Sequence, residues 1–421
     1  MKNTVAVILA AGRGTRMKSD RPKVLHELLG KPMILYLLDS LKEAGITDII
    51  AVAGYGSERL KAALKEVKVV TQKELLGSGD AILQVKRILG RYSGDVLVLY
   101  GDTPLIRYET IKNLITRHKG SSASATILTV TLSDPTGYGR IVRDDKGHIV
   151  KIVEEGDARF YEEVIKEINA GVYCFKAGDL FEALSGVRPE NKKKEYYLTD
   201  VIGILHKYGK RIESISSINV DEVIGVNTRR DLAAATRILK GYISEDLMSN
   251  GVTIQDPLST VIYPDVRIGK ETIIYPYTII ESDVKIGEDC RIGPFTHIRP
   301  RVSIGDEVEI GNFVELVRTK VGDRTKVKHH TYLGDTVVGK DVNVGAGTIT
   351  ANFDGKKKNE TVIEDGVFIG VGAILIAPVR VGKNAVVGAG CVVPKNHNVP
   401  KGATVVGVPA RVLERSQRRE R

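Results

Sequence analysis

The sequence predicts two parts of different architecture, an α/β domain with a mainly parallel sheet followed by a parallel β-helix. In the first half, short apolar runs alternate with segments of helical spacing, which is typical of parallel sheets. After about residue 250, an aliphatic residue recurs at every sixth position, which indicates a solenoid of six-residue repeats. The chain has 43 Gly and no Trp among its 421 residues, in keeping with many tight corners and a narrow core.

The first part is predicted to span residues 1–227. Its apolar runs and helical patterns follow one another in strict alternation, so right-handed crossovers should place the strands side by side. The expected strands are Val5–Leu9, Asp48–Ala53, Val67–Thr71 and Val96–Tyr100, and the expected helices are Met33–Glu43, Ser57–Glu66, Asp80–Leu89, Tyr108–His118 and Leu198–Tyr208. Between them, residues 123–175 look mostly extended and predict an inserted antiparallel ribbon. A linker helix is expected over residues 228–250.

The second part is predicted to span residues 251–415. Ten aliphatic residues stand six apart without interruption: Ile262, Ile268, Ile274, Ile280, Ile286, Ile292, Ile298, Ile304, Ile310 and Leu316. The phase slips at Val321 and Val338, restarts at Ile363 and runs to Val393, which gives about seven coils of three repeats. Residues 346–360 read as an interruption that carries three lysines. Residues 416–421 form a short basic tail.

Composition and charge narrow the function classes. The formal net charge is +10, which favours anionic partners, and part of it lies in the Arg-rich end of the chain. The three cysteines are far apart and form no metal-binding pattern, so we expect neither a disulfide framework nor structural zinc. The longest uncharged apolar stretch, Val367–Val379, is shorter than the ~20 residues that a membrane span needs. We therefore expect a soluble, cytoplasmic protein without membrane insertion.

A glycine-rich loop follows the first strand directly, with Gly12 and Gly14 placed so that the backbone could approach a phosphate. It is not a dinucleotide fingerprint, because Met17 stands where the third glycine belongs. Taken alone, a plain strand-to-helix turn would explain it equally well. Arg16 and Lys23 add two cations beside the loop, which makes phosphate binding the better interpretation.

The string LAAGRGTRMKSDRPKVLH closely resembles the sugar-1-phosphate nucleotidyltransferases. Further pieces resemble the branch that makes UDP-N-acetylglucosamine: Tyr100-Gly101-Asp102-Thr103-Pro104, Gly137-Tyr138-Gly139-Arg140, Asn169-Ala170-Gly171 and Gly225-Val226-Asn227. Together with the repeats, the chain resembles the bifunctional N-acetylglucosamine-1-phosphate uridylyltransferase/glucosamine-1-phosphate acetyltransferases over nearly its whole length, weakening after Ala389. The resemblance implies a Rossmann-like nucleotidyltransferase domain, a left-handed β-helix and a homotrimer.

For uridylyl transfer, the resemblance implies a sugar-phosphate oxygen that attacks the α-phosphate of UTP while pyrophosphate leaves. Arg16 and Lys23 would be catalytic by neutralising charge. Asp102 and Asn227 would hold Mg²⁺. Asp102 also follows a buried strand, where α/β sheets place their ligands, although a strand-end turn could equally use an aspartate. The remaining substrate-binding residues implied are Leu9, Ala10, Ala11, Gly12, Gln72, Gly77, Ser78, Tyr100, Gly139, Glu154 and Asn169, with Gln72, Gly77 and Ser78 at uracil and the last three at the sugar.

For acetyl transfer from acetyl-CoA to glucosamine 1-phosphate, a base near neutral pH must take a proton from the amine, and histidine suits that task. The segment KVKHHTYLGD resembles the family's active site and assigns the base to His329. His330 is expected on the opposite face of the same strand. The resemblance assigns the amino sugar phosphate to Arg299, Tyr332, Asn343 and Lys358. It assigns acetyl-CoA to Ala346, Asn352, Phe353, Val371 and Ala389.

The second half also departs from the family's usual residues. Val317 stands where a lysine is usual, Lys328 where a small residue precedes the histidine, Phe353 where a tyrosine is usual, Val371 where a small polar residue is usual, and Gly407 where an arginine would bind CoA.

Two other interpretations remain open on the sequence. The β-helix could be a trimerisation scaffold for a monofunctional nucleotidyltransferase. A metal-bound hydratase-like site would need three converging histidines, for which His297, His329 and His330 are a poor match. A nucleic-acid partner is not expected, because the phosphate-handling motifs already account for a cationic surface.

Overall fold

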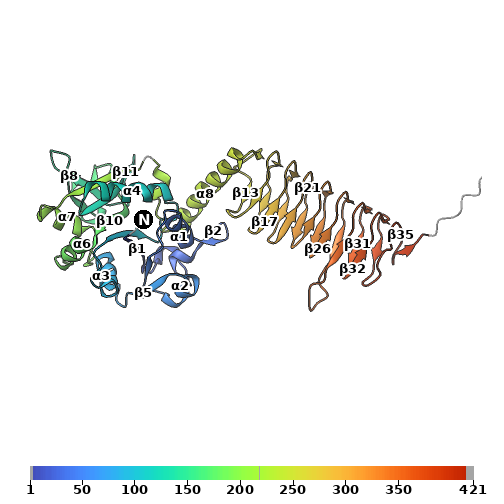
Figure 1. Cartoon of the computed structure of the whole chain (residues 1–421), viewed down its shortest axis with the longest axis horizontal. Helices are drawn as coiled ribbons and strands as arrows, with labels where there is room; N and C mark the ends of the chain where they lie inside the picture. The colour runs from blue at the N-terminus through green and yellow to red at the C-terminus, as the bar shows by residue number, and fades with distance from the viewer. Residues whose placement is uncertain (1–2, 218, 414–421) are drawn as a thin grey trace, which may run out of the picture. The chain divides into compact units, whose positions relative to one another are not determined.

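The computed structural model describes residues 3–217 and 219–413, and the chain divides into two compact units, Met1–Thr236 and Arg237–Arg421. The first unit combines helices with a sheet, and the second contains a stack of short strands (Figure 1). The predicted tail at residues 416–421 lies outside the described residues. Over those residues, no helix combines the length and the apolar character that a membrane span requires.

The first unit is built on a nine-stranded mixed sheet, whose main path has the order β11-β7-β10-β6-β1-β4-β5. Its strands are β1 (Thr4–Ala10), β4 (Ile49–Ala53), β5 (Lys68–Thr71), β6 (Asp95–Tyr100), β7 (Ala125–Thr131), β8 (Arg140–Arg143), β9 (Ile149–Val153), β10 (Glu167–Lys176) and β11 (Ile212–Ser216). A separate hairpin joins β2 (Glu27–Leu28) to β3 (Lys31–Pro32). Every residue of β1 is buried, as expected for a central strand covered on both faces.

The strand order reverses beside β1. Along the chain, β1, β4 and β5 extend the sheet in one direction, and β6 then pairs with the other edge of β1 in parallel. In doubly wound sheets, ligands bind outside the carboxyl ends of the strands at this reversal. The order therefore points to the ends of β1 and β6.

The helices of the first unit flank this sheet (Figure 1). They are α1 (Met33–Glu43), α2 (Ser57–Ala63), α3 (Ser78–Leu89), α4 (Tyr108–Ser121), α5 (Phe160–Glu163), α6 (Ala177–Ser185) and α7 (Asp200–Lys207), with the short 3-10 turns η1 (Thr15–Met17), η2 (Lys23–Leu25), η3 (Glu155–Asp157) and η4 (Val220–Val223). The predicted helix Met33–Glu43 is confirmed at both ends, and the other predicted helices are confirmed within a few residues. Helix α8 (Arg229–Ser249) runs through the boundary between the two units.

The antiparallel ribbon predicted over residues 123–175 is only partly right. Strands β8 and β9 do pair as a ribbon. Strand β10, in contrast, inserts between β6 and β7 and runs antiparallel to both. Seven of the ten residues of β10 are buried, so the strand needs cover on both faces, which a central place in the sheet provides.

The second unit is the predicted parallel β-helix. Consecutive strands turn through three sheets, and each strand pairs in parallel with the one a full coil later. One sheet contains β12 (Thr253–Ile254), β15 (Ile273–Ile274), β18 (Arg291–Ile292), β21 (Glu309–Asn312), β24 (Lys326–His329), β27 (Asn343–Val344), β30 (Phe368–Ile369), β33 (Val386–Val387), β35 (Thr404–Val406) and β36 (Arg411–Val412), the last antiparallel.

The other two sheets share this stacking. The second contains β13 (Val261–Ile262), β16 (Ile279–Ile280), β19 (His297–Ile298), β22 (Glu315–Val317), β25 (Tyr332–Gly334), β28 (Ile349–Ala351), β31 (Ile374–Ile376) and β34 (Val392–Val393). The third contains β14 (Arg267–Ile268), β17 (Val284–Ile286), β20 (Val302–Ile304), β23 (Lys320–Val321), β26 (Thr336–Val338), β29 (Thr361–Ile363) and β32 (Val379–Val381).

The repeated aliphatic residues form the core of the solenoid. All of those named in the prediction are buried in one cluster, except that Ile268 is half-buried against it. Besides the end repeats at Ile254 on β12 and Val405 on β35, the sequence missed one internal repeat, because its inward residue is Thr350 on β28. The Thr350 hydroxyl accepts a hydrogen bond from Gly334 N at 2.9 Å, so this polar side chain is satisfied inside the core.

One row of corners in the solenoid carries aromatic rings on four coils and glycine on the next three. Tyr277, Phe295, Phe313 and His330 occupy this corner on successive coils, all with positive φ. Their rings stack with centroids 4.9, 5.4 and 4.9 Å apart. The next three coils place Gly347, Gly372 and Gly390 at the same corner, also with positive φ, so the aromatic row gives way to open backbone.

Candidate functional site

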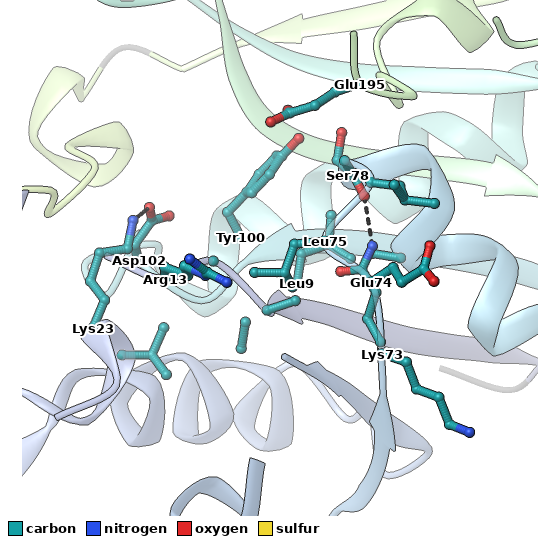
Figure 2. Close-up of a pocket in the computed structure, with 18 residues that line it drawn as sticks. Leu9, Arg13, Lys23, Lys73, Glu74, Leu75, Ser78, Tyr100, Asp102 and Glu195 are labelled. Atoms are coloured by element: carbon teal, nitrogen blue, oxygen red, sulfur yellow. Dashed lines mark hydrogen bonds and ion pairs between the residues drawn. The ribbon is translucent and has the colours of Figure 1, made fainter. Parts of the chain in front are cut away.

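A cavity of about 900 Å³ lies at the carboxyl ends of β1 and β6, where the strand order reverses. In Figure 2, Lys23, Asp102 and Arg13 lie on one side and Lys73, Glu74 and Ser78 on the other, with Tyr100 between them. Ten of the predicted site residues line this cavity: Leu9, Ala10, Ala11, Gly12, Lys23, Gln72, Gly77, Ser78, Tyr100 and Asp102. The reversal of strand order thus brings together predicted residues from four separate segments of the chain.

The glycine-rich loop packs closely against Lys23 at Gly14. Gly14 has φ +62°, and a Cβ there would come within 2.7 Å of Lys23 Cβ. A Cβ on Gly12 would meet no atom within 4 Å. Gly14 is therefore required by the fold of the loop, whereas the space beside Gly12 is open and belongs to the cavity.

Lys23 bridges Asp102 and Asn227. Its Nζ donates a short hydrogen bond to Asp102 Oδ2 and a second one, of 3.0 Å, to Asn227 Oδ1. Arg16 Nη2 also donates to Asn227 Oδ1, at 2.9 Å. Asn227 is itself held by its backbone N–H, which donates to Asp231 Oδ2 at 2.9 Å in the first turn of α8. The four predicted residues Arg16, Lys23, Asp102 and Asn227 therefore form one cluster.

This cluster has the donor atoms that Mg²⁺ prefers. A carboxylate and a carboxamide oxygen both face the ammonium group of Lys23, so their arrangement already accepts a cation. Among the described residues, no group of three or more His, Cys, Asp or Glu side chains is arranged to hold a metal. A magnesium ion here would complete its shell with water and phosphate oxygens, as it commonly does.

Gln72 is positioned by protein groups on two sides. Its Nε2 donates to Gly77 O at 3.1 Å and to Asp80 Oδ2 at 2.7 Å. Both N–H bonds of the amide are then used, which leaves the side-chain oxygen to a ligand.

The residues predicted at the sugar do not line the same cavity. Glu154 faces a neighbouring cavity of about 610 Å³, where it accepts a hydrogen bond from Thr199 at 3.0 Å. Burial is the main cause that raises the pKa of Glu154. Asp200 lines the same cavity, and burial together with the charges of Glu154 and Asp157 raises its pKa to about 6. Gly139 and Asn169 are joined by a hydrogen bond of 2.8 Å from Asn169 N to Gly139 O.

The sequence missed several residues of the main cavity. Arg13, Lys73, Glu74 and Glu195 all line it, although none was assigned a role. Arg13 could have been found from its place between the two loop glycines. Glu195 could not, because only the fold brings the segment before α7 to this edge of the sheet.

On the solenoid, His329 ends β24, and its Nδ1 lies 2.7 Å from Asn312 Oδ1 on the coil before. A carboxamide oxygen can only accept, so Nδ1 carries the proton and Nε2 is left with a free lone pair. The side chains of His329 and His330 are exposed. The prediction that His330 lies on the opposite face of the strand is wrong. His330 has φ +43° and stands at the corner, stacked on Phe313, because the strand ends one residue earlier.

A second network joins three consecutive coils. The Arg318 guanidinium forms two hydrogen bonds to Asp335, of 2.5 and 2.7 Å, and Asn352 Nδ2 donates to Asp335 Oδ2 at 2.5 Å. The hydrogen bond from Arg318 is the main cause that lowers the pKa of Asp335. Val317, which replaces the family's usual lysine, is buried. Arg318 was not assigned a role, although its distance of 17 residues from Asp335, one coil, was a usable signal.

The residues predicted to hold the amino sugar phosphate are divided between two sheets and the hairpin after β28. Arg299 donates to Glu315 Oε1 at 3.1 Å, Tyr332 follows Glu315 in the sheet, and Asn343 lies beside Lys326. Lys358 pairs with Phe353 at the base of a hairpin that projects between β28 and β29 (Figure 1).

Asp354 holds that hairpin closed. Its carboxylate accepts from the backbone N–H groups of Lys356 and Lys357 at 3.0 and 2.9 Å and from Asn359 Nδ2 at 2.9 Å. These hydrogen bonds keep the pKa of Asp354 well below its usual range. The hairpin is therefore built around an ionised carboxylate.

The residues predicted at acetyl-CoA include three that stack at one corner. Ala346, Val371 and Ala389 each stand between two glycines, on consecutive coils. Ala346 O accepts from Gly372 N, and Val371 O accepts from Gly390 N, both at 2.7 Å. With no side chains on the flanking glycines, the corner leaves room for an extended ligand.

Two family models match separate parts of the chain. Residues 5–219 match a family model described as nucleotidyl transferase. Residues 283–318 and 360–395 match the model described as bacterial transferase hexapeptide (six repeats).

Several curated relatives are similar over nearly the whole chain, and each carries the name "Bifunctional protein GlmU". The one from Pelotomaculum thermopropionicum is 45% identical over 89% of this chain and 90% of that protein. The one from Carboxydothermus hydrogenoformans is 44% identical over 95% and 96%. The one from a Geobacillus species is 46% identical over 96% and 95%. Among solved structures, a UDP-glucose pyrophosphorylase complexed with UDP-glucose is 21% identical with a TM-score of 0.48, covering 57% of this chain and 100% of that one.

Proposed function

This chain belongs to the bifunctional GlmU family, and from that premise we propose that it makes UDP-N-acetylglucosamine in two steps. The solenoid transfers an acetyl group from acetyl-CoA to glucosamine 1-phosphate. The α/β unit then transfers a uridylyl group from UTP to N-acetylglucosamine 1-phosphate and releases pyrophosphate. The monofunctional alternative is not favoured, because the relatives match both halves of the chain.

The observation that carries this proposal is the cluster of Arg16, Lys23, Asp102 and Asn227 at the ends of β1 and β6. In uridylyl transfer, the attacking phosphate oxygen is already ionised, so the enzyme needs to align the reactants and neutralise charge. Two fixed cations beside a glycine-rich loop suit the triphosphate. We infer that Asp102 and Asn227 hold Mg²⁺, which would offset the negative charge of the phosphates.

Gln72 supports uracil as the base. Its two amide N–H bonds are held by Gly77 and Asp80, so its oxygen would accept a hydrogen bond from a ring N–H. Uracil has such an N–H at N3, and cytosine has a lone pair in that place. The arrangement favours UTP over CTP, because in a complex with CTP the Gln72 oxygen and cytosine N3 would face each other as two acceptors.

For acetyl transfer, His329 is the general base. Its Nδ1–H donates to Asn312 Oδ1, which leaves Nε2 as the basic nitrogen. Nε2 takes a proton from the amine nitrogen as that nitrogen attacks the thioester carbonyl. The carbon–sulfur bond then breaks, and the imidazolium returns the proton to sulfur, so that CoA leaves as its thiol. Backbone N–H groups near Ala346, together with Asn352, would face the developing oxyanion.

The row of glycine-flanked corners supports an extended pantetheine arm beside Ala346, Val371 and Ala389. Arg299, Tyr332, Asn343 and Lys358 would hold the amino sugar phosphate. We also propose a homotrimer, because the left-handed hexapeptide-repeat proteins that this chain resembles usually form trimers. Its substrates are the small molecules UTP, the amino-sugar 1-phosphates and acetyl-CoA, and the proposed place of action is the cytoplasm.

The test measures both half-reactions separately in the full chain. Thiol release is followed with acetyl-CoA and glucosamine 1-phosphate, and pyrophosphate release with UTP and N-acetylglucosamine 1-phosphate. We expect both activities in the wild type, and His329→Ala should lose thiol release while it keeps pyrophosphate release. Pyrophosphate release without any wild-type thiol release would support the monofunctional scaffold instead. Undiminished thiol release in His329→Ala would overturn the assignment of the base.

A further inference from the structure

Tyr173 is a buried tyrosine near the site to which neither sequence nor family resemblance assigned a role. It lies in the middle of β10 with no exposed surface, and its ring stacks on that of Phe175 with centroids 5.6 Å apart. A phenol buried at this depth is costly unless its hydroxyl finds hydrogen-bond partners. The identity of those partners indicates what the hydroxyl is for.

The first partner is Asn169, whose Nδ2 donates to Tyr173 Oη at 2.6 Å. Four residues of a regular strand span roughly 13 Å, so this contact cannot form on a straight strand. The pairing of β10 with β7 shifts register between Asn169 and Tyr173, which is a β-bulge. The bulge includes Gly171, with φ +74°, where a Cβ would lie 2.8 Å from the ring of Tyr100. The backbone is thus shaped to bring these side chains together.

The orientation of the Asn169 amide follows from these contacts. Gly171 N donates to Asn169 Oδ1 at 3.1 Å, so the oxygen faces the backbone and the nitrogen faces Tyr173. One amide N–H remains for a ligand. Without the Tyr173 hydroxyl, the Nδ2 side of the amide would lose the partner that helps to fix it.

The second residue that interacts with Tyr173 is Tyr100. Burial is the main cause that raises the pKa of both phenols, and each tyrosine also affects the pKa of the other. Tyr100 and Ser78 line the main cavity. Tyr173 is therefore hydrogen-bonded to Asn169, at the predicted sugar end, and also interacts with Tyr100, which lines the main cavity.

We propose that Tyr173 is a positioning residue for the sugar phosphate. Its hydroxyl holds the Asn169 amide toward the sugar, without touching either substrate itself. The inference rests on the proposed uridylyl transfer and assigns to that reaction a residue outside the cavity lining.

The test is Tyr173→Phe, which removes one oxygen and keeps the ring and its stacking. Loss of this hydrogen bond should raise the KM for N-acetylglucosamine 1-phosphate by about tenfold, while the KM for UTP stays within about twofold. The matched control is Tyr92→Phe, which removes a half-buried hydroxyl that donates to Asp95 O at 3.4 Å, away from the cavity lining. The control should leave both KM values unchanged.

A double variant shows whether Tyr173 acts through Asn169. In an Asn169→Ala background, Tyr173→Phe should no longer change the KM for the sugar phosphate, because its target is gone. Additive effects would overturn the inference, as would an unchanged sugar-phosphate KM in the single variant. Equal rises in both KM values with a lower melting temperature would mean a structural role only, and would also overturn it. A wild type without uridylyl transfer would instead refute the proposed function.

Discussion

The Nδ1 atom of His329 lies 2.7 Å from the side-chain oxygen of Asn312, one coil earlier in the solenoid. The two residues are 17 positions apart and belong to neighbouring strands of one sheet, β21 and β24. A single amide oxygen thus sets the tautomer of the imidazole and leaves Nε2 free to act as a base.

Asn312→Ala should slow acetyl transfer because the imidazole loses the contact that fixes its tautomer and its ring orientation. We expect kcat for thiol release to fall by about 10- to 100-fold, less than for removal of the base itself, which contributes about 10²- to 10⁴-fold. Pyrophosphate release from UTP serves as the internal control and should not change. An Asn312→Ala enzyme with full acetyltransferase kcat would show that the contact is not needed for the reaction.

Asp102→Asn should have the opposite effect to Asn312→Ala: it should impair uridylyl transfer and spare acetyl transfer. The variant removes the carboxylate that faces Lys23 and that we assign to Mg²⁺, so uridylyl transfer should fall at least about a hundredfold. Binding of Mn²⁺, followed by its electron spin resonance, should weaken in parallel. Acetyl transfer should persist, and loss of both activities would argue against two separate sites.

Gly14→Ala and Gly12→Ala should differ although they lie two residues apart. At Gly14, an added Cβ meets Lys23 and the left-handed backbone costs about 1–2 kcal/mol, so the melting temperature should decrease. At Gly12, the added Cβ is unopposed in the free protein, so the melting temperature should hold while the KM for UTP rises. Equal thermal destabilisation in both variants would contradict this division of roles.

Asp200 should make the first unit sensitive to pH. Burial and the charges of Glu154 and Asp157 raise its pKa to about 6, so the folded state binds the proton more tightly than the unfolded state does. The proton bound by Asp200 therefore stabilises the folded state at pH 4, and this stabilisation is lost as pH rises through 6. Asp200→Asn should melt at a higher temperature than the wild type at pH 8, with a difference that shrinks toward pH 4. A variant that melts lower than the wild type at pH 8 would refute this account.

Much of the fold could be predicted because its signals are local and repeated. The strand Val5–Leu9 is a continuous apolar run, and the solenoid repeats the same inward residue coil after coil, so neither needs distant contacts to be recognised. The six-residue pattern cannot be recognised where a polar side chain occupies the inward-facing position. Thr350 broke the repeat in the sequence, yet it lies in the core because Gly334 satisfies its hydroxyl.

The sequence by itself determined the two-part architecture, the family and the residue types that can handle phosphates and take a proton. Only the tertiary structure decided which of these side chains act together. The pairing of His329 with Asn312, of Arg318 with Asp335, and of Tyr173 with Asn169 depends on a full coil or on a β-bulge. Hydrogen bonds act over about 3 Å, and such distances between residues far apart in the chain are set by how strands stack and bend.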